Sequence, residues 1–132
     1  MSAENVEVVR RALAAMDRSL DRVVEFWAPD IDWRAIEGAP DDIGVFQGHE
    51  AMRRYYGQWY ETFENIDSQT EELIDGGEHV VAILRVVGQM KGSDAKIDMR
   101  LGIVYTVKGG LIVRGREYAS REEALAAAGL AE

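Results

Sequence analysis

Cysteine is absent from this 132-residue sequence, which excludes a disulfide, a thiolate nucleophile and a cysteine metal site. The two histidines, His49 and His79, are far apart and have no suitably spaced carboxylates, so no metal-ligand pattern is visible. A glycine-rich phosphate loop and a serine nucleophile elbow are also missing. We therefore expect a protein that works with no metal and no nucleotide or other cofactor.

Long hydrophobic runs are lacking as well. No segment approaches the roughly 20 apolar residues that a membrane-spanning helix needs, so we expect no membrane partner. The first residues, Met1–Asn5, are polar and acidic and contain neither a basic nor an apolar region. No signal peptide is visible, and the expected location is cytoplasmic.

Basic residues are scarce, with 15 Lys and Arg against 24 Asp and Glu and a net charge of −9. The basic residues are interspersed with acidic ones, so binding to the phosphates of a nucleic acid is not expected. The length fits a single domain over residues 1–132, and the chain contains no repeat or linker.

Helical spacing of apolar residues predicts three helices, at Ala3–Met16, Leu20–Trp27 and His49–Phe63. Ser19 is placed to cap the second helix. The third helix carries an aromatic stripe made of Tyr55, Tyr56, Trp59 and Phe63. A buried hydroxyl needs a partner, so we expect at least one of these tyrosines to point its hydroxyl into a cavity.

Strand patterns alternate with turns at Ile31–Ile36, Gln69–Ile74, His79–Met90, Lys96–Val107 and Leu111–Tyr118. A loop is expected over Glu37–Gly48, and Ser120 with Glu123 forms a capping box that opens a short final helix. This order of elements predicts an α+β fold. We expect a cone-shaped, strongly curved and mostly antiparallel sheet wrapped around three helices, with a hydrophobic pocket between them.

Alternation within the last strands predicts which side chains point inward. Lys96–Val107 has one almost wholly apolar face, formed by Ile97, Met99, Leu101, Ile103, Tyr105 and Val107. In Leu111–Tyr118 the face expected to point inward is formed by Leu111, Val113, Gly115 and Glu117. His79–Met90 is apolar on both faces except at Arg85, which favours helices on one side and a partner subunit on the other. We therefore expect a homodimer through the convex sheet face, using Val104, Arg114, Arg116 and Tyr118.

Several segments resemble the nuclear-transport-factor-2-like superfamily, in its SnoaL-like branch of cone-shaped α+β proteins. The likeness covers essentially the whole chain, and the segments that carry it are Phe26–Trp33, Phe46–Arg53, Glu72–Asp75, Gly110–Tyr118 and Ser120–Leu125. The resemblance implies the fold. Function is open, because this superfamily includes isomerases, dehydratases, hydrolases, cyclases and proteins that only bind.

The chemistry of known members of this superfamily is matched only in part. The base of ketosteroid isomerases falls at Ala35, and the acid of SnoaL-type polyketide cyclases falls near Gly102 or Ile103. Enzymes similar to limonene epoxide hydrolase use an arginine flanked by two carboxylates. Arg85 and Glu117 match the arginine and one of these acids.

The residue expected to carry chemistry is Glu117. An acid at the end of an apolar face loses hydration, which raises its pKa and suits a general acid or base. Arg85 is expected to be its electrostatic partner; if the two lie two strands apart, an ion pair across the central strand would satisfy both, with or without catalysis. The side chains expected to shape the pocket are Trp33, Tyr56, Trp59, Met99 and Ile103.

Two functions remain open from the sequence. One is an isomerase, hydrolase or dehydratase that acts without a cofactor on a small hydrophobic molecule. The other is a non-catalytic module for binding a small ligand or for dimerisation, which fits the loss of the acid positions used by known enzymes.

Overall fold

The computed structural model of the protein describes residues 2–16, 19–38 and 44–130. Its helices are α1 (Ser2–Met16), α2 (Leu20–Val23), α3 (His49–Thr62) and α4 (Arg121–Ala127), with a 3₁₀ turn at Val24–Phe26. Its strands are β1 (Trp27–Arg34), β2 (Phe46–Gln47), β3 (Phe63–Gly76), β4 (His79–Met90), β5 (Lys96–Lys108) and β6 (Leu111–Tyr118).

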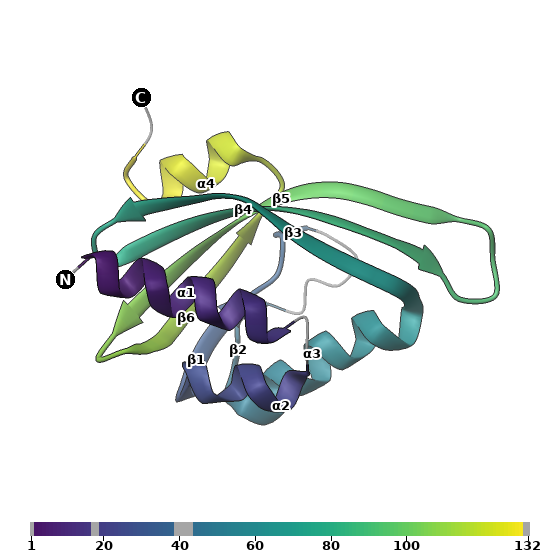
Figure 1. Cartoon of the computed structure of the whole chain (residues 1–132), viewed down its shortest axis with the longest axis horizontal. Coiled ribbons are helices and arrows are strands. Elements are labelled where there is room, and N and C mark those ends of the chain that lie inside the picture. The colour runs from purple at the N-terminus through teal and green to yellow at the C-terminus, as the bar shows by residue number, and fades with distance from the viewer. Residues whose placement is uncertain (1, 17–18, 39–43, 131–132) are drawn as a thin grey trace.

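The strands form one sheet with the order β2-β1-β6-β5-β4-β3. The β1–β6 pair is parallel, and the other neighbouring pairs are antiparallel. Helices α1, α2 and α3 lie on one side of the sheet, and α4 lies on the other (Figure 1). The predicted α+β fold with a mostly antiparallel sheet is therefore confirmed. Within the described ranges, no helix is long and apolar enough to cross a membrane.

Two serine caps explain where short helices begin. The Ser19 hydroxyl accepts a hydrogen bond of 3.3 Å from the Arg22 amide at the start of α2. The Ser120 hydroxyl accepts one of 3.2 Å from the Glu123 amide at the start of α4. Both caps satisfy amides that the first turn of a helix leaves without a partner, and both predictions are confirmed.

Element boundaries differ from the predictions where the chain bends. The second helix ends earlier than predicted, because β1 already begins at Trp27. The predicted loop contains the short strand β2, while residues 39–43 lie outside the described part of the chain. Strand β3 is much longer than Gln69–Ile74, because two register shifts let it follow β4 through a bend. One shift lies beside Asn65, whose φ of 56° is a left-handed conformation that asparagine tolerates.

The core lies between the inner face of the sheet and helices α1, α2 and α3. Leu101, Ile103, Tyr105 and Val107 of β5 all belong to it, as the alternation predicts. Strand β6 departs from simple alternation, because Thr106 pairs with Arg114 while Val107 pairs with Ile112. Val113 is therefore an extra residue, and the bulge turns Ile112 into the core. Simple alternation, with Leu111 and Val113 inward, predicts that Ile112 faces outward, and this prediction is wrong because the pattern in the sequence does not reveal a bulge.

Helix α4 covers part of the outer face. Val81, Ile83 and Val104 form a second apolar cluster with Ala124 of this helix. The approach is close, because a Cβ on Gly102 would lie 2.6 Å from the Cβ of Ala124. Val104, which the sequence assigned to a subunit interface, is thus covered by the chain itself and only 7% exposed. The homodimer stays a prediction, with Arg114 exposed on that face.

Strands β1 and β6 meet at a contact that depends on a glycine. Trp33 and Gly115 are register partners in this parallel pair. A Cβ on Gly115 would lie 2.0 Å from Cζ3 of the Trp33 ring, so no larger residue fits unless the ring moves. Trp33 is only 1% exposed and is surrounded by the core, which leaves its ring little freedom to move.

We predict that Gly115→Ala lowers the free energy of unfolding by about 1–3 kcal/mol, as overpacking of a filled core does. The matched control is Gly57→Ala in α3, where a Cβ would meet nothing within 4 Å. That change should raise stability by about 0.5–1 kcal/mol, because alanine is the better helix former. Urea denaturation measures both values, and equal midpoints for the two variants would contradict the prediction.

Candidate functional site

Glu117 is a buried acid on the inner side of β6, with 8% of its surface exposed. The indole N–H of Trp33 donates a hydrogen bond of 2.9 Å to its Oε2 atom. The hydroxyl of Tyr55 lies 3.0 Å from both carboxylate oxygens. Because an indole N–H can only donate, Oε2 must accept, and donors of this kind favour the charged carboxylate.

These three side chains come from three different elements. Trp33 lies on β1 and Tyr55 on the buried face of α3, at separations of 84 and 62 residues from Glu117. The sheet order brings β1 beside β6, and α3 packs on β1. Trp33 reaches the carboxylate because its ring lies against Gly115, two residues before Glu117. The site is therefore a product of the fold, built on rigid elements.

A cavity of about 110 Å³ lies between the sheet and the helices, with Glu117 in its wall. Its aromatic lining consists of Trp27, Trp33, Tyr55, Tyr56, Trp59, Tyr60 and Tyr105. Most of the remaining lining is aliphatic and includes Leu13, Met16, Val23, Leu84, Val86, Leu101, Ile103 and Ile112. Tyr60 is 41% exposed, which places it at the mouth of the cavity.

The aromatic rings are in contact with one another. Trp27 and Tyr56 are stacked, with ring centroids 6.0 Å apart and an interplanar angle of 15°. The Trp33 ring meets Tyr56 edge-on at 6.1 Å and Tyr105 at 5.7 Å. Tyr55 and Tyr56 are 5.1 Å apart, also edge-to-face. Such offset and edge-to-face contacts stabilise aromatic clusters and fix the orientation of each ring.

Two tyrosines report the electrostatic character of the cavity. Burial raises the pKa of Tyr56 well above its ordinary value, and the nearby negative charge of Glu117 raises it further. The pKa of Tyr105 is raised by the same two causes, burial first and Glu117 second. Both phenols are therefore protonated at neutral pH, and both lie in a negative potential.

The structure brings most of the predicted pocket residues together. Trp33, Tyr56, Trp59 and Ile103 all line the cavity that holds Glu117. Met99 does not line it; this side chain packs against the core next to Val86, its partner on β4.

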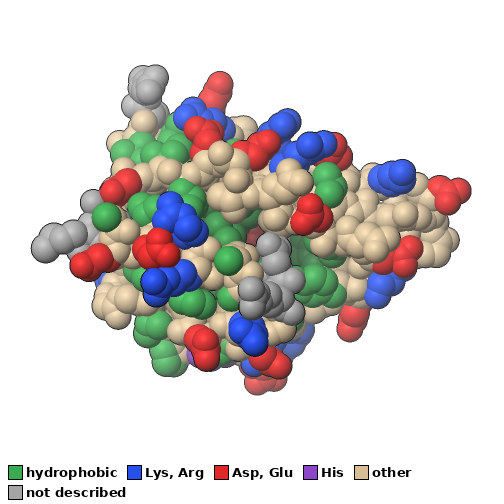
Figure 2. Space-filling view, viewed as in Figure 1, with side chains coloured by type: hydrophobic (Ala, Val, Ile, Leu, Met, Phe, Trp, Pro, Cys, Tyr) green, Lys and Arg blue, Asp and Glu red, His purple; other side chains and the backbone are tan. Residues whose placement is uncertain are grey.

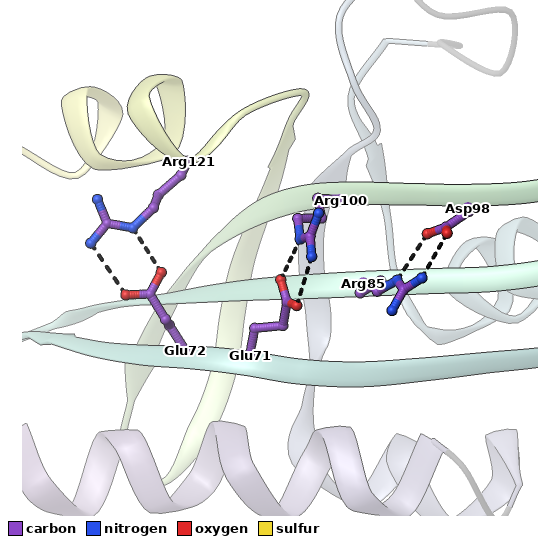
Figure 3. A network of polar contacts seen from close by, with 6 residues as sticks. All are labelled: Glu71, Glu72, Arg85, Asp98, Arg100 and Arg121. Atoms are coloured by element: carbon purple, nitrogen blue, oxygen red, sulfur yellow. Dashed lines mark hydrogen bonds and ion pairs between the residues drawn. The ribbon is translucent and has the colours of Figure 1, made fainter.

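Arg85 lies on the wrong face of the sheet for a partner of Glu117. Its neighbour Leu84 belongs to the core, so Arg85 points outward, where it forms two hydrogen bonds of 2.9 and 2.7 Å with Asp98. Figure 3 shows this pair in a row with the pairs Arg100–Glu71 and Arg121–Glu72 along the outer face. The predicted ion pair between Arg85 and Glu117 is wrong, although they do lie two strands apart.

Neither histidine is among the described residues that line the cavity. The His49 ring nitrogen Nε2 lies 2.9 Å from the Trp27 carbonyl oxygen, and since a carbonyl only accepts, the histidine must donate. His79 contacts the Thr106 hydroxyl at 3.0 Å. Among the described residues, no group of three or more His, Asp or Glu side chains could hold a metal ion.

Sequence reasoning missed two parts of the site. Trp27 was assigned to the end of a helix, whereas it begins β1 and stacks on Tyr56. The specific partner of Glu117 on α3, Tyr55, could not be chosen from an aromatic stripe in which two adjacent tyrosines both qualified. Tyr105 could have been found, because its strand alternation already placed it inward.

Residues 8–115 match the family described as the SnoaL-like domain. The chain belongs to this SnoaL-like family. An NTF2-like protein from Burkholderia thailandensis is similar to this SnoaL-like domain at 22% identity, with a TM-score of 0.78 and 95% of each chain covered. No curated protein matches the sequence.

Two further solved structures share the fold of this SnoaL-like domain. A proposed SnoaL-like polyketide cyclase from Jannaschia is 20% identical, with a TM-score of 0.77 and coverage of 100% of this chain and 95% of that one. A protein from Catenulispora acidiphila with a ketosteroid isomerase-like fold, in complex with trimethylamine, is 21% identical. Its TM-score is 0.73, with 94% of this chain and 93% of that chain covered.

We predict that Tyr55→Phe lowers the free energy of unfolding by about 1–3 kcal/mol, because it removes a donor from a buried acid. The matched control is Tyr118→Phe on the outer face, for which a change within about 0.5 kcal/mol is expected. Thermal or urea denaturation measures the difference. Similar stabilities for both variants would mean that the Tyr55 hydroxyl adds nothing to the site.

We also predict that stability falls as the pH rises above about 10, the ordinary pKa of tyrosine. Below that pH, folded and unfolded chains both keep the phenol protons of Tyr56 and Tyr105. Above it, the unfolded chain loses protons that the folded chain retains, because both pKa values are raised on folding. The free energy of unfolding should then fall by up to about 1.4 kcal/mol per pH unit for each tyrosine.

Urea denaturation across this range tests the slope, and Tyr56→Phe should make it shallower. An unchanged slope in that variant would show that the Tyr56 hydroxyl loses its proton equally readily in both states.

Proposed function

We propose that this SnoaL-like domain binds a small, largely apolar molecule in its cavity and transfers a proton through Glu117. The reaction class is a cofactor-independent isomerisation, hydration or dehydration. The observation that carries the proposal is a buried carboxylate, oriented by Trp33 and Tyr55, in the wall of an aromatic cavity. Glu117 is thereby a candidate general base, and the apolar lining limits the number of water molecules that compete for the proton.

The chemistry balances without a redox partner. Glu117 takes a proton from a carbon next to an electron-withdrawing group, and the C–H electron pair moves into the substrate. The acid that forms then returns the proton to a different carbon, which shifts a double bond, or to a departing hydroxyl, which releases water. Tyr56 and Tyr105, kept protonated by their raised pKa values, are hydrogen-bond donors for oxygen that becomes negative during the reaction.

The volume of the cavity limits the size of the substrate. A cavity of about 150 Å³ accommodates one benzene ring, and the cavity here is about 110 Å³. The trimethylamine held by the Catenulispora protein is within that volume. We therefore propose substrates with a few heavy atoms, up to about one ring.

A non-catalytic binding module is the second candidate. Trp33 and Tyr55 already donate to Glu117, and donors that favour the charged carboxylate also make it a weaker base. The same geometry therefore suits a carboxylate that recognises a ligand and keeps its proton state. Turnover distinguishes the two candidates, because binding alone yields no product.

A ligand screen by thermal shift should find molecules that stabilise the wild type more than Glu117→Gln. The screen uses small alcohols, epoxides, enones and cyclic ketones with up to about one ring. A ligand at about 100 times its dissociation constant adds about 2.7 kcal/mol, which raises the melting temperature by several degrees. The control Glu122→Gln makes the same chemical change on the exposed surface of α4 and should behave as the wild type.

Conversion of a hit is followed by NMR. Product formed by the wild type and by Glu122→Gln, with a loss of about 100-fold or more in Glu117→Gln, would support proton transfer by this carboxylate. Hits that bind without conversion would establish the binding module instead. Binding and turnover that are unchanged in Glu117→Gln would overturn both roles of this residue.

A further inference from the structure

We propose that the cavity selects small organic cations, of the alkylammonium class, over neutral molecules of the same shape. This inference rests on the proposed function in one respect, that the cavity around Glu117 is where the ligand binds. It goes further by assigning the charge of that ligand, which neither the family nor the reaction class determines.

The first support is the composition of the wall. Seven of the described lining residues are tryptophan or tyrosine. The face of an aromatic ring is negative, so rings attract an organic cation that has lost its water, most strongly where the site excludes solvent. Trp27 and Trp33 are 3% and 1% exposed, and the stacking of Trp27 on Tyr56 holds the ring of this tyrosine in place. A ligand therefore meets rings that are already oriented.

The second support is the charge of the wall. Of the described residues that line the cavity, Glu117 is an acid and none is lysine, arginine or histidine. The donors Trp33 and Tyr55 favour its ionised form and are themselves uncharged. Two neighbouring phenols lie within reach of the same negative charge, as the raised pKa values of Tyr56 and Tyr105 show. The Glu117 carboxylate would attract a bound cation and repel an anion.

The third support is volume. A cavity of about 150 Å³ accommodates benzene, which has six heavy atoms, and the cavity here is somewhat smaller, at about 110 Å³. Trimethylammonium has four heavy atoms and tetramethylammonium has five. Tetramethylammonium presents methyl groups on all four sides and trimethylammonium on three, which suits a wall of rings and aliphatic side chains. In trimethylammonium, the remaining N–H can donate to the Glu117 carboxylate.

The test compares probes of the same shape in the wild-type protein. Tetramethylammonium and tert-butanol each carry four groups around a central atom, and they differ in charge. We expect tetramethylammonium to bind about tenfold more tightly, as a desolvated cation–π site together with one carboxylate provides. Trimethylammonium should bind at least as tightly, because of its N–H. Isothermal titration calorimetry or NMR titration at constant ionic strength, with sodium as the reference cation, gives the dissociation constants.

Two variants test which side chains cause the preference for the cation. Glu117→Gln keeps the shape and removes the charge, so the preference for the cation should fall severalfold while tert-butanol binds as before. Trp59→Leu removes one ring from a partly buried position and should weaken the cation alone. The surface control Glu122→Gln should leave every constant unchanged. Circular dichroism confirms that each variant is folded, and the comparison in the wild type needs no variant.

Each outcome separates the two proposals. Tighter binding of the cation, lost in Glu117→Gln, supports the inference. Equal or tighter binding of tert-butanol in the wild type overturns it, while leaving the cavity as the ligand site of the proposed function. Absence of binding by any of the three probes overturns the cation preference, and hits from the thermal-shift screen then decide the proposed function independently.

Discussion

The contact between Trp33 and Gly115 is the constraint on which the rest of the site depends. The ring of Trp33 occupies the space that a side chain at residue 115 would need. From there its indole N–H reaches Glu117, and its edge meets the rings of Tyr56 and Tyr105. Because residue 115 has no Cβ, the Trp33 ring packs against it. This one contact positions the hydrogen-bond donor to Glu117, part of the aromatic wall of the cavity and strand β1. The contact lies within the parallel β1–β6 pair, in which these two residues are register partners.

The two faces of the sheet carry different kinds of interaction. The inner face is almost wholly apolar and aromatic, with Glu117 as a buried charge. The outer face carries exposed arginine–carboxylate pairs in a row (Figure 3), beside an apolar cluster that α4 covers. Exposed pairs of this kind add little stability, but they keep a long sheet face charged and hydrated. In the view of Figure 2, acidic and basic side chains are likewise interspersed.

A buried carboxylate held by neutral donors has a limited range of roles. Trp33 and Tyr55 stabilise the charge and are themselves neutral, and the charge of Glu117 raises the pKa of Tyr56, which indicates a negative potential at that ring. That potential favours a ligand that is positive, or one that gives up a proton to the carboxylate. Binding and catalysis share this physical basis. They differ in whether the ligand has a proton that Glu117 can remove, which is a property of the ligand as much as of the protein.

Much of this architecture follows from the sequence alone. Periodicity places the helices, the long strands β4, β5 and β6 and the inner face of β5, because side-chain burial repeats every 3.6 residues in a helix and every two in a strand. The same alternation identifies Glu117 as an acid on an apolar face, and the serine caps mark where α2 and α4 begin.

Tertiary structure decides the rest. A bulge at Val113 shifts the alternation of β6, and a strand pattern cannot show where one extra residue enters. Arg85 faces outward to Asp98, although an arginine in an apolar strand gives no sign of which way it points. The partners of Glu117 are 84 and 62 residues away. Local sequence sets the spacing of side chains along a helix or strand, whereas only the packing of distant elements determines which face is buried and what each residue meets there.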